Sequence, residues 1–169
     1  MTAINHPLPM SYIKHKGYFD ISKLLQSIRK WFLDRDYDFH FTKHKFKIPS
    51  PAGVEQEIEL HGERKINEYV KFNIKLFMRF FDLKEVELVK EGQKIKTNSG
   101  RVAIEISASM IFDYENRFGG SKFVQAAQDF YHKFVIKRTI EEEWEDQLFM
   151  KMIDLMKLMR KQFEHEAVA

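Results

Sequence analysis

Two stretches in which apolar and polar residues alternate strictly constrain the fold of this chain more than any other feature. They lie within residues 66–81 and 101–112. The apolar residues are Val70, Phe72, Ile74, Leu76, Met78 and Phe80 in the first stretch, and Val102, Ile104, Ile106, Ala108, Met110 and Phe112 in the second. Successive side chains of a strand point to opposite faces, so this period predicts strands with one buried and one solvated face. Strands of this kind are typical of an antiparallel sheet.

Shorter alternating stretches predict the remaining strands. Residues 37–48 alternate around aromatic side chains and change parity near Lys43, which predicts a bulge there. Residues 54–61 alternate in the same way, and residues 12–16 are predicted to form a short edge strand. A further short strand includes residues 86–88. The chain therefore predicts five or six antiparallel strands.

Residues that favour turns separate these strands. Glu91-Gly92 is typical of a hairpin turn. Pro49 to Gly53, Gly62 with the charged residues after it, and Asn98-Ser99-Gly100 are also predicted to be turns. These positions divide the central part of the chain into the strands described above.

Helical patterns flank the predicted strands on both sides. Asp20 is a suitable N-cap for an amphipathic helix over about residues 21–34. After the last strand, Ser121 is a suitable N-cap for a helical region that extends to Phe163. Its first part repeats apolar residues at helical spacing, namely Phe123, Ala127, Phe130 and Phe134.

A second start signal lies inside this C-terminal region. Thr139 is followed three residues later by Glu142, as in a capping box, and glutamates favour the positive end of a helix. The pattern predicts two helices, over about 121–137 and 140–164, with a bend near Thr139. One continuous helix is the alternative.

The order of elements predicts an α+β fold, in which an N-terminal helix, a curved antiparallel sheet of five to six strands and a long C-terminal helical segment pack together. This order resembles that of helix-grip proteins of the START type. The resemblance implies a sheet that wraps the C-terminal helix and often leaves an apolar cavity. A chain of 169 residues predicts one domain, here residues 18–165, preceded by an extended segment at residues 1–17.

The helix predicted at 140–164 is apolar on almost every side, whereas a surface helix usually keeps a polar face. Met152 and Met156 lie in the main apolar stripe and Met150 and Leu158 on the remaining side, and these four are the candidate partner-binding residues, because Met-rich surfaces adapt to partners. This observation favours a non-enzymatic interaction or assembly module that binds a protein partner or another copy of the chain. Burial of the same helix between the sheet and the first C-terminal helix is the structural alternative.

The helix-grip resemblance supports a second hypothesis, which is that the protein binds an apolar small ligand. Such a ligand would occupy a cavity between the sheet and the C-terminal helix. The expected lining is Phe72, Ile74, Leu76, Ile106, Met110 and Phe134.

The opposite face of the longest strand supports a third hypothesis, which is binding of RNA or single-stranded DNA. There Lys71, Lys75 and Arg79 have the same parity as Tyr69 and Phe77. Cations interleaved with aromatic rings often hold single strands. The net charge is only +3, although residues 1–50 hold nine Lys and Arg against four Asp.

The remaining sequence patterns argue against several kinds of functional site. The absence of Cys excludes disulfides and thiolate chemistry, and agrees with a cytoplasmic location. His40 and His44 lie in a predicted strand, where four residues span about 13 Å, so one metal ion cannot bind both. Glu55, Glu57 and Glu59 are expected on a solvated sheet face. We therefore expect no cofactor, no metal, no catalytic residue and no segment that inserts into a membrane.

Overall fold

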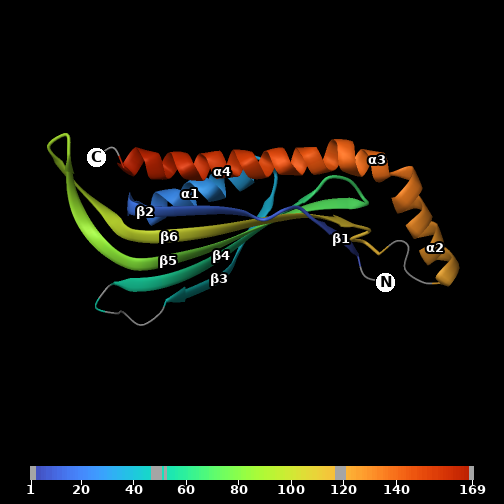
Figure 1. Ribbon diagram of the computed structural model, residues 1–169, viewed down its shortest axis with the longest axis horizontal. Coiled ribbons are helices and arrows are strands. Elements are labelled where there is room, and N and C mark those ends of the chain that lie inside the picture. Colours follow the sequence, from blue (N-terminus) through green and yellow to red (C-terminus); the bar gives the residue numbers. More distant parts are fainter. Residues whose placement is uncertain (1–2, 47–50, 52, 117–120, 168–169) are drawn as a thin grey trace.

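The structure is a computed structural model that describes residues 3–46, 51, 53–116 and 121–167. It confirms the α+β prediction. A curved, open, antiparallel sheet forms one layer, and helices α1 (Ile21–Leu33) and α4 (Asp146–Ala167) form a second layer on one face (Figure 1). The other face of the sheet carries no helix in the described part of the chain.

Six strands form the sheet. They are β1 (Ile4–Pro7), β2 (Ser11–Phe19), β3 (Asp38–Phe46), β4 (Val54–Lys65), β5 (Val70–Lys90) and β6 (Gln93–Phe112). Their order is β1-β6-β5-β4-β3, and β2 also pairs with β6, beyond the end of β1. Both N-terminal strands are thus edge strands against β6, and the segment expected to be extended at residues 1–17 lies mostly in the sheet.

The core lies between the sheet and the two long helices. Every second residue is buried there from Val70 to Phe80 in β5 and from Val102 to Phe112 in β6, as the alternation predicts. Helix α1 contributes Leu24, Ile28, Trp31 and Phe32, and helix α4 contributes Leu148, Met152, Leu155, Met159 and Phe163. The N-cap of α1 is also as predicted, because the Asp20 carboxylate accepts a hydrogen bond from the Lys23 amide at 3.0 Å.

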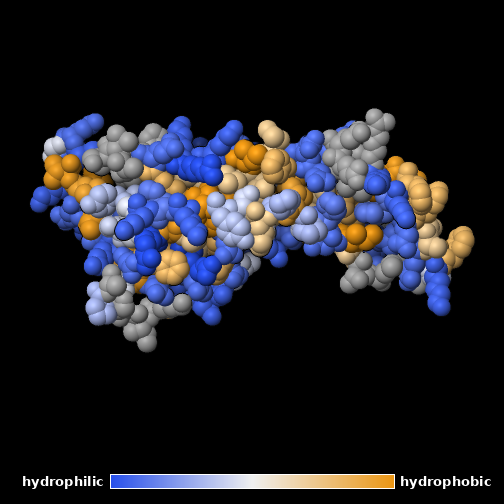
Figure 2. Space-filling view, viewed as in Figure 1, coloured by the Kyte–Doolittle hydropathy of each residue, from blue (hydrophilic) through white to orange (hydrophobic). Residues whose placement is uncertain are grey.

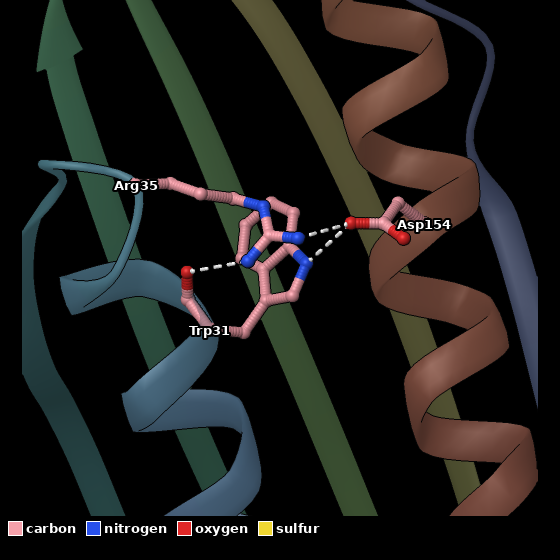
Figure 3. Close-up of polar contacts among 3 residues, drawn as sticks. All are labelled: Trp31, Arg35 and Asp154. Carbon is pink, nitrogen blue, oxygen red and sulfur yellow. Dashed lines mark hydrogen bonds and ion pairs between the residues drawn. The ribbon is translucent and has the colours of Figure 1, made fainter.

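A polar contact fixes α4 against the end of α1 (Figure 3). One Asp154 oxygen, Oδ2, accepts hydrogen bonds from Trp31 Nε1 at 2.8 Å and from Arg35 Nη2 at 2.7 Å. The Arg35 guanidinium also lies 4.5 Å from the centre of the Trp31 ring. The Trp31 indole N–H thus has a partner although the ring is buried, and Asp154 is paired although it lies on the polar side of α4.

The central strands are longer than the turn signals predict. Residues 98–100 do not form a turn, because β6 runs through them as a strand. Gly100 lies beside a register shift between Phe81 and Lys84 of β5, and a Cβ on Gly100 would lie 2.8 Å from the Phe81 carbonyl oxygen. Gly100 therefore permits close approach of two strands. The predicted hairpin turn at Glu91-Gly92 is present, and the predicted bulge in β3 lies between Phe41 and Lys43.

Gly62 was also predicted to be a turn, but it lies inside β4. A Cβ at this position would lie 2.3 Å from the Phe32 ring, which packs directly on the Gly62 backbone. The missing side chain leaves room for α1 to approach the sheet. Both glycines mark close packing rather than chain reversal.

The C-terminal region bends earlier than predicted. It consists of α2 (Lys122–Phe130), a π-helical segment η1 (Tyr131–Val135), α3 (Lys137–Thr139), a second π-helical segment η2 (Ile140–Glu145) and α4. The break lies at Ile136, with φ −106° and ψ −3°, whereas Thr139 is helical and its side chain caps nothing. Gly119-Gly120, which precede the predicted cap, lie outside the described residues. Ser121 does cap α2, since its hydroxyl accepts from the Val124 amide at 3.4 Å.

Candidate functional site

The bend at Ile136 directs α2 away from the body of the protein (Figure 1). Three phenylalanines of α2 and η1 that were expected on a helix face are largely exposed, namely Phe123 at 83%, Phe130 at 61% and Phe134 at 67%. We call these three residues the α2 phenylalanine stripe. Figure 2 shows hydrophobic residues gathered at this end of the molecule. Monomeric proteins rarely leave such a group of large side chains in water.

The opposite side of α2 is anchored to the sheet by a small buried cluster. The Gln128 amide donates a hydrogen bond to Asp113 Oδ2 at 3.2 Å, and both residues are buried. The His132 ring meets the edge of Phe112, with ring centres 4.7 Å apart. Burial lowers the pKa of His132, with a smaller contribution from His6. This cluster sets the direction of α2 and leaves the phenylalanine stripe facing outwards.

Charge is distributed unevenly along the C-terminal region. Around the stripe, the exposed residues Lys122 and Lys133 outweigh the exposed Asp129. The beginning of α4 and the turn before it are acidic, with Glu143 and Asp146 exposed. Adjacent parts of the same helical region thus carry opposite charges and are complementary to one another.

The four residues of α4 that were predicted to bind a partner have different surroundings. Met150 is 60% exposed and lies beside the partly exposed Phe149. Met156 and Leu158 are partly buried against the core, and Met152 is completely buried in it. Only Met150 therefore presents a large apolar surface, and Met152 is a core residue that cannot reach a partner.

The residues predicted to line a cavity separate into two groups. Phe72, Ile74, Leu76, Ile106 and Met110 are all buried in the main core cluster, where they contact neighbouring apolar side chains. Phe134 lies outside that cluster, in the α2 phenylalanine stripe. The structure therefore does not bring the six residues together around one space.

The residues predicted to bind nucleic acid lie on the outer face of the sheet, with one exception. Lys71 Nζ is 2.8 Å from a Glu63 oxygen, and Arg79 Nη2 is 2.7 Å from a Glu105 oxygen. The hydrogen bond from Lys71 lowers the pKa of Glu63. Both cations are thus compensated across neighbouring strands.

The other three residues of this prediction differ in exposure. Phe77 lies under the Arg79 guanidinium at 5.3 Å, and Lys75 is exposed. Tyr69 precedes β5 and packs against Phe112 and Tyr131 instead of lying on the outer face. Burial raises the pKa of Tyr69, and the nearby Asp113 carboxylate adds to this effect.

The histidines and glutamates that the sequence analysis considered as metal ligands or acid–base groups lie on the strands. His40 is opposite His61 across β3 and β4, whereas His44 lies beyond the bulge, next to Gln56. Glu59 pairs with Lys43 at 3.2 Å. Within the described ranges, no three His, Asp or Glu residues are arranged to hold a metal ion. No helix in the described part of the chain is long and apolar enough to cross a membrane.

Comparisons with known proteins provide little further information. No family model matches the sequence, and no curated protein matches it. Among solved structures, an uncharacterised protein from Rhizobium leguminosarum is similar over 96% of this chain and 99% of its own, at 10% identity and a TM-score of 0.25. A similarity this weak carries no argument.

Proposed function

We propose that this protein is a non-enzymatic assembly module that associates with a second copy of itself through the α2 phenylalanine stripe. The observation that carries the proposal is the exposure of Phe123, Phe130 and Phe134 on one side of a projecting helix. We place this role in the cytoplasm, as expected from the sequence.

The apolar area favours a protein partner over chance exposure. A phenylalanine has roughly 150–250 Å² to bury, so the three exposed fractions correspond to about 400 Å². A stable interface buries about 800 Å² on each partner. The stripe supplies about half of this area, and the exposed Phe149 and Met150 at the start of α4 supply further apolar surface.

Charge complementarity favours a second copy as the partner. In a two-fold symmetric interface every contact occurs twice, with the roles of the two copies exchanged. Residues of α2 in each copy can therefore face residues near the start of α4 in the other. Lys122 and Lys133 would then meet Glu143 and Asp146 of the second copy. The same arrangement places the phenylalanine stripe of each copy against Phe149 and Met150 of the other.

The first test is the molar mass in solution, measured by light scattering after gel filtration across a concentration series. We expect a dimer of the 20.3 kDa chain that dissociates in the Phe130→Glu and Phe134→Glu variants. Phe46→Glu is the matched control, because Phe46 is as exposed as Phe134 but lies at the end of β3. A wild-type monomer at all concentrations would overturn the proposal.

A charge-swap experiment tests the proposed arrangement. Lys122→Glu with Lys133→Glu should weaken association, and so should Glu143→Lys with Asp146→Lys. A mixture of the two variants should restore it, since both sets of pairs are complementary in the mixed dimer: the negative α2 of one variant faces the positive start of α4 of the other, and the second set is as in the wild type. Failure of the mixture to associate better than either variant alone would contradict the pairing of α2 with the start of α4.

A further inference from the structure

A second surface, far from α2 in the fold, carries a cluster of cations on the outer face of the sheet. Neighbouring strands place Lys14 and Lys16 of β2, Arg101 of β6, and Arg79 and Lys84 of β5 together, and we call these five residues the β2 basic edge. In the register, Lys14 and Arg79 flank Ala103, while Lys16 lies opposite Arg101. Lys84 of β5 lies opposite Ser99, the next residue of β6 on the same face as Arg101.

This cluster has an excess of positive charge. Arg79 pairs with Glu105 at 2.7 Å, and Arg101 pairs with Asp82 at 2.6 Å. Lys14, Lys16 and Lys84 form no ion pair with a residue that the structure describes. Five cations therefore face two carboxylates, whereas Lys71 and Lys43 on the β4 side of the same face are each paired with a glutamate.

The cluster surrounds a shallow, open depression. A space of about 500 Å³ opens between Lys14, Lys16, Arg79 and Arg101, with Phe81 and Ala103 also lining it. A second hollow, of about 460 Å³, adjoins it and shares Lys16 and Arg101. Small residues of β6, such as Ala103 and Gly100, leave room for a ligand to approach the sheet.

Aromatic rings lie on both sides of the cations. Residues 12, 14, 16 and 18 of β2 point to the same face, so Tyr12 and Tyr18 flank the two lysines. These tyrosines are 54% and 41% exposed. Six residues of strand span about 20 Å, which is enough for a short run of nucleotides. The Arg101 guanidinium also lies 5.6 Å from the centre of the Phe81 ring.

We infer that the β2 basic edge binds single-stranded nucleic acid, with phosphates at Lys14, Lys16 and Lys84 and bases stacked on Tyr12 and Tyr18. A positively charged groove with aromatic rings along it holds single strands without reading their sequence. A duplex fits less well, because its bases are already stacked and cannot reach the rings. This inference is independent of the assembly proposed for α2.

The test is fluorescence anisotropy with a labelled twelve-nucleotide oligo-dT and the full-length protein. We expect binding that weakens about 20-fold between 50 and 200 mM salt, because three neutralised phosphates give a logarithmic slope of about −2. Lys14→Glu with Lys16→Glu should weaken binding at least tenfold. Tyr12→Ala with Tyr18→Ala should weaken it at least fivefold without changing the salt slope.

The matched control is Lys90→Glu with Lys94→Glu, which makes the same charge change at exposed residues beside the β5–β6 hairpin turn. It should leave binding within twofold of the wild type. Circular dichroism on every variant would verify that the fold is retained.

Three outcomes would overturn the inference. The first is the absence of oligonucleotide binding at 50 mM salt, in which case the lysines serve only to protect an edge strand from pairing with another sheet. The second is binding that the Lys14 and Lys16 substitutions leave unchanged. The third is binding to vesicles containing phosphatidylserine without binding to the oligonucleotide, which would assign the cluster to a lipid surface.

Discussion

Helices α2 and α4 belong to one C-terminal region and carry similar apolar stripes, but only one of these stripes is covered. Leu148, Met152, Leu155 and Met159 of α4 lie against the sheet and are completely buried. Phe123 and Phe130 of α2 and Phe134 of η1 face solvent, because the bend at Ile136 carries this segment past the end of the sheet (Figure 1). The comparison teaches that apolar periodicity identifies a face of a helix but does not identify what covers it.

The largest expected difference between the two helices is in how far an alanine substitution lowers the free energy of unfolding. Leu155→Ala in α4 should lower the free energy of unfolding by about 2–5 kcal/mol, since it removes a fully buried side chain and leaves a cavity. Phe130→Ala in α2 should lower the stability of the isolated chain by less than about 0.5 kcal/mol, because its ring is exposed. Urea unfolding at low protein concentration measures both. Equal losses would show that α2 belongs to the core.

A smaller difference is expected between the polar anchors of the two helices. Asp154→Ala should cost about 1–2 kcal/mol of global stability, because it leaves the buried Trp31 indole N–H without its acceptor. Gln128→Ala should instead increase amide hydrogen exchange within α2 while exchange in β5 and β6 stays unchanged. Exchange measured by mass spectrometry separates the two helices. Faster exchange in the whole sheet after Gln128→Ala would contradict an independent α2.

The smallest expected effect is a pH dependence of stability that arises from His132, in the cluster that anchors α2. Burial lowers the pKa of His132 below its ordinary value of 6.5, so the unfolded chain binds this proton more readily than the folded chain. The contribution of His132 to stability is complete above pH 6.5 and is lost as the pH falls through the lower folded value. The wild type should therefore lose more stability than His132→Phe between pH 7.5 and pH 5.5 in urea unfolding. Parallel losses in both proteins would rule out this role of His132.

Much of the fold could be predicted from the sequence because its signals are local. Alternation located β5 and β6, and the caps at Asp20 and Ser121 located the starts of α1 and α2. Prediction was wrong at Gly62 and Gly100, where glycine accommodates a neighbouring ring or strand instead of a turn. A glycine has the same appearance in a sequence whether it permits a turn or a close approach, and only the neighbours distinguish the two.

The candidate surfaces could be predicted less well, because they depend on register and on where a helix ends. The spacing of Phe123, Phe130 and Phe134 was visible, but the sequence could not show that the sheet ends before it reaches them. Arg79 was expected to be available on a basic face, but the cross-strand register brings Glu105 to it. The cations of β2 were not recognised, since they gain significance only when β6 places Arg101 beside Lys16.

The bulge in β3 has a consequence for how many copies can assemble. Strand β3 is the edge of the sheet opposite β2, and its register shifts between Phe41 and Lys43. A bulged, lysine-bearing edge is a poor template for another strand, which disfavours pairing of the sheet with that of another molecule. The two-fold association that we propose through the helices would use each patch once and stop at two copies. The edge at β3 therefore agrees with the closed pair that we propose and disfavours a growing fibre.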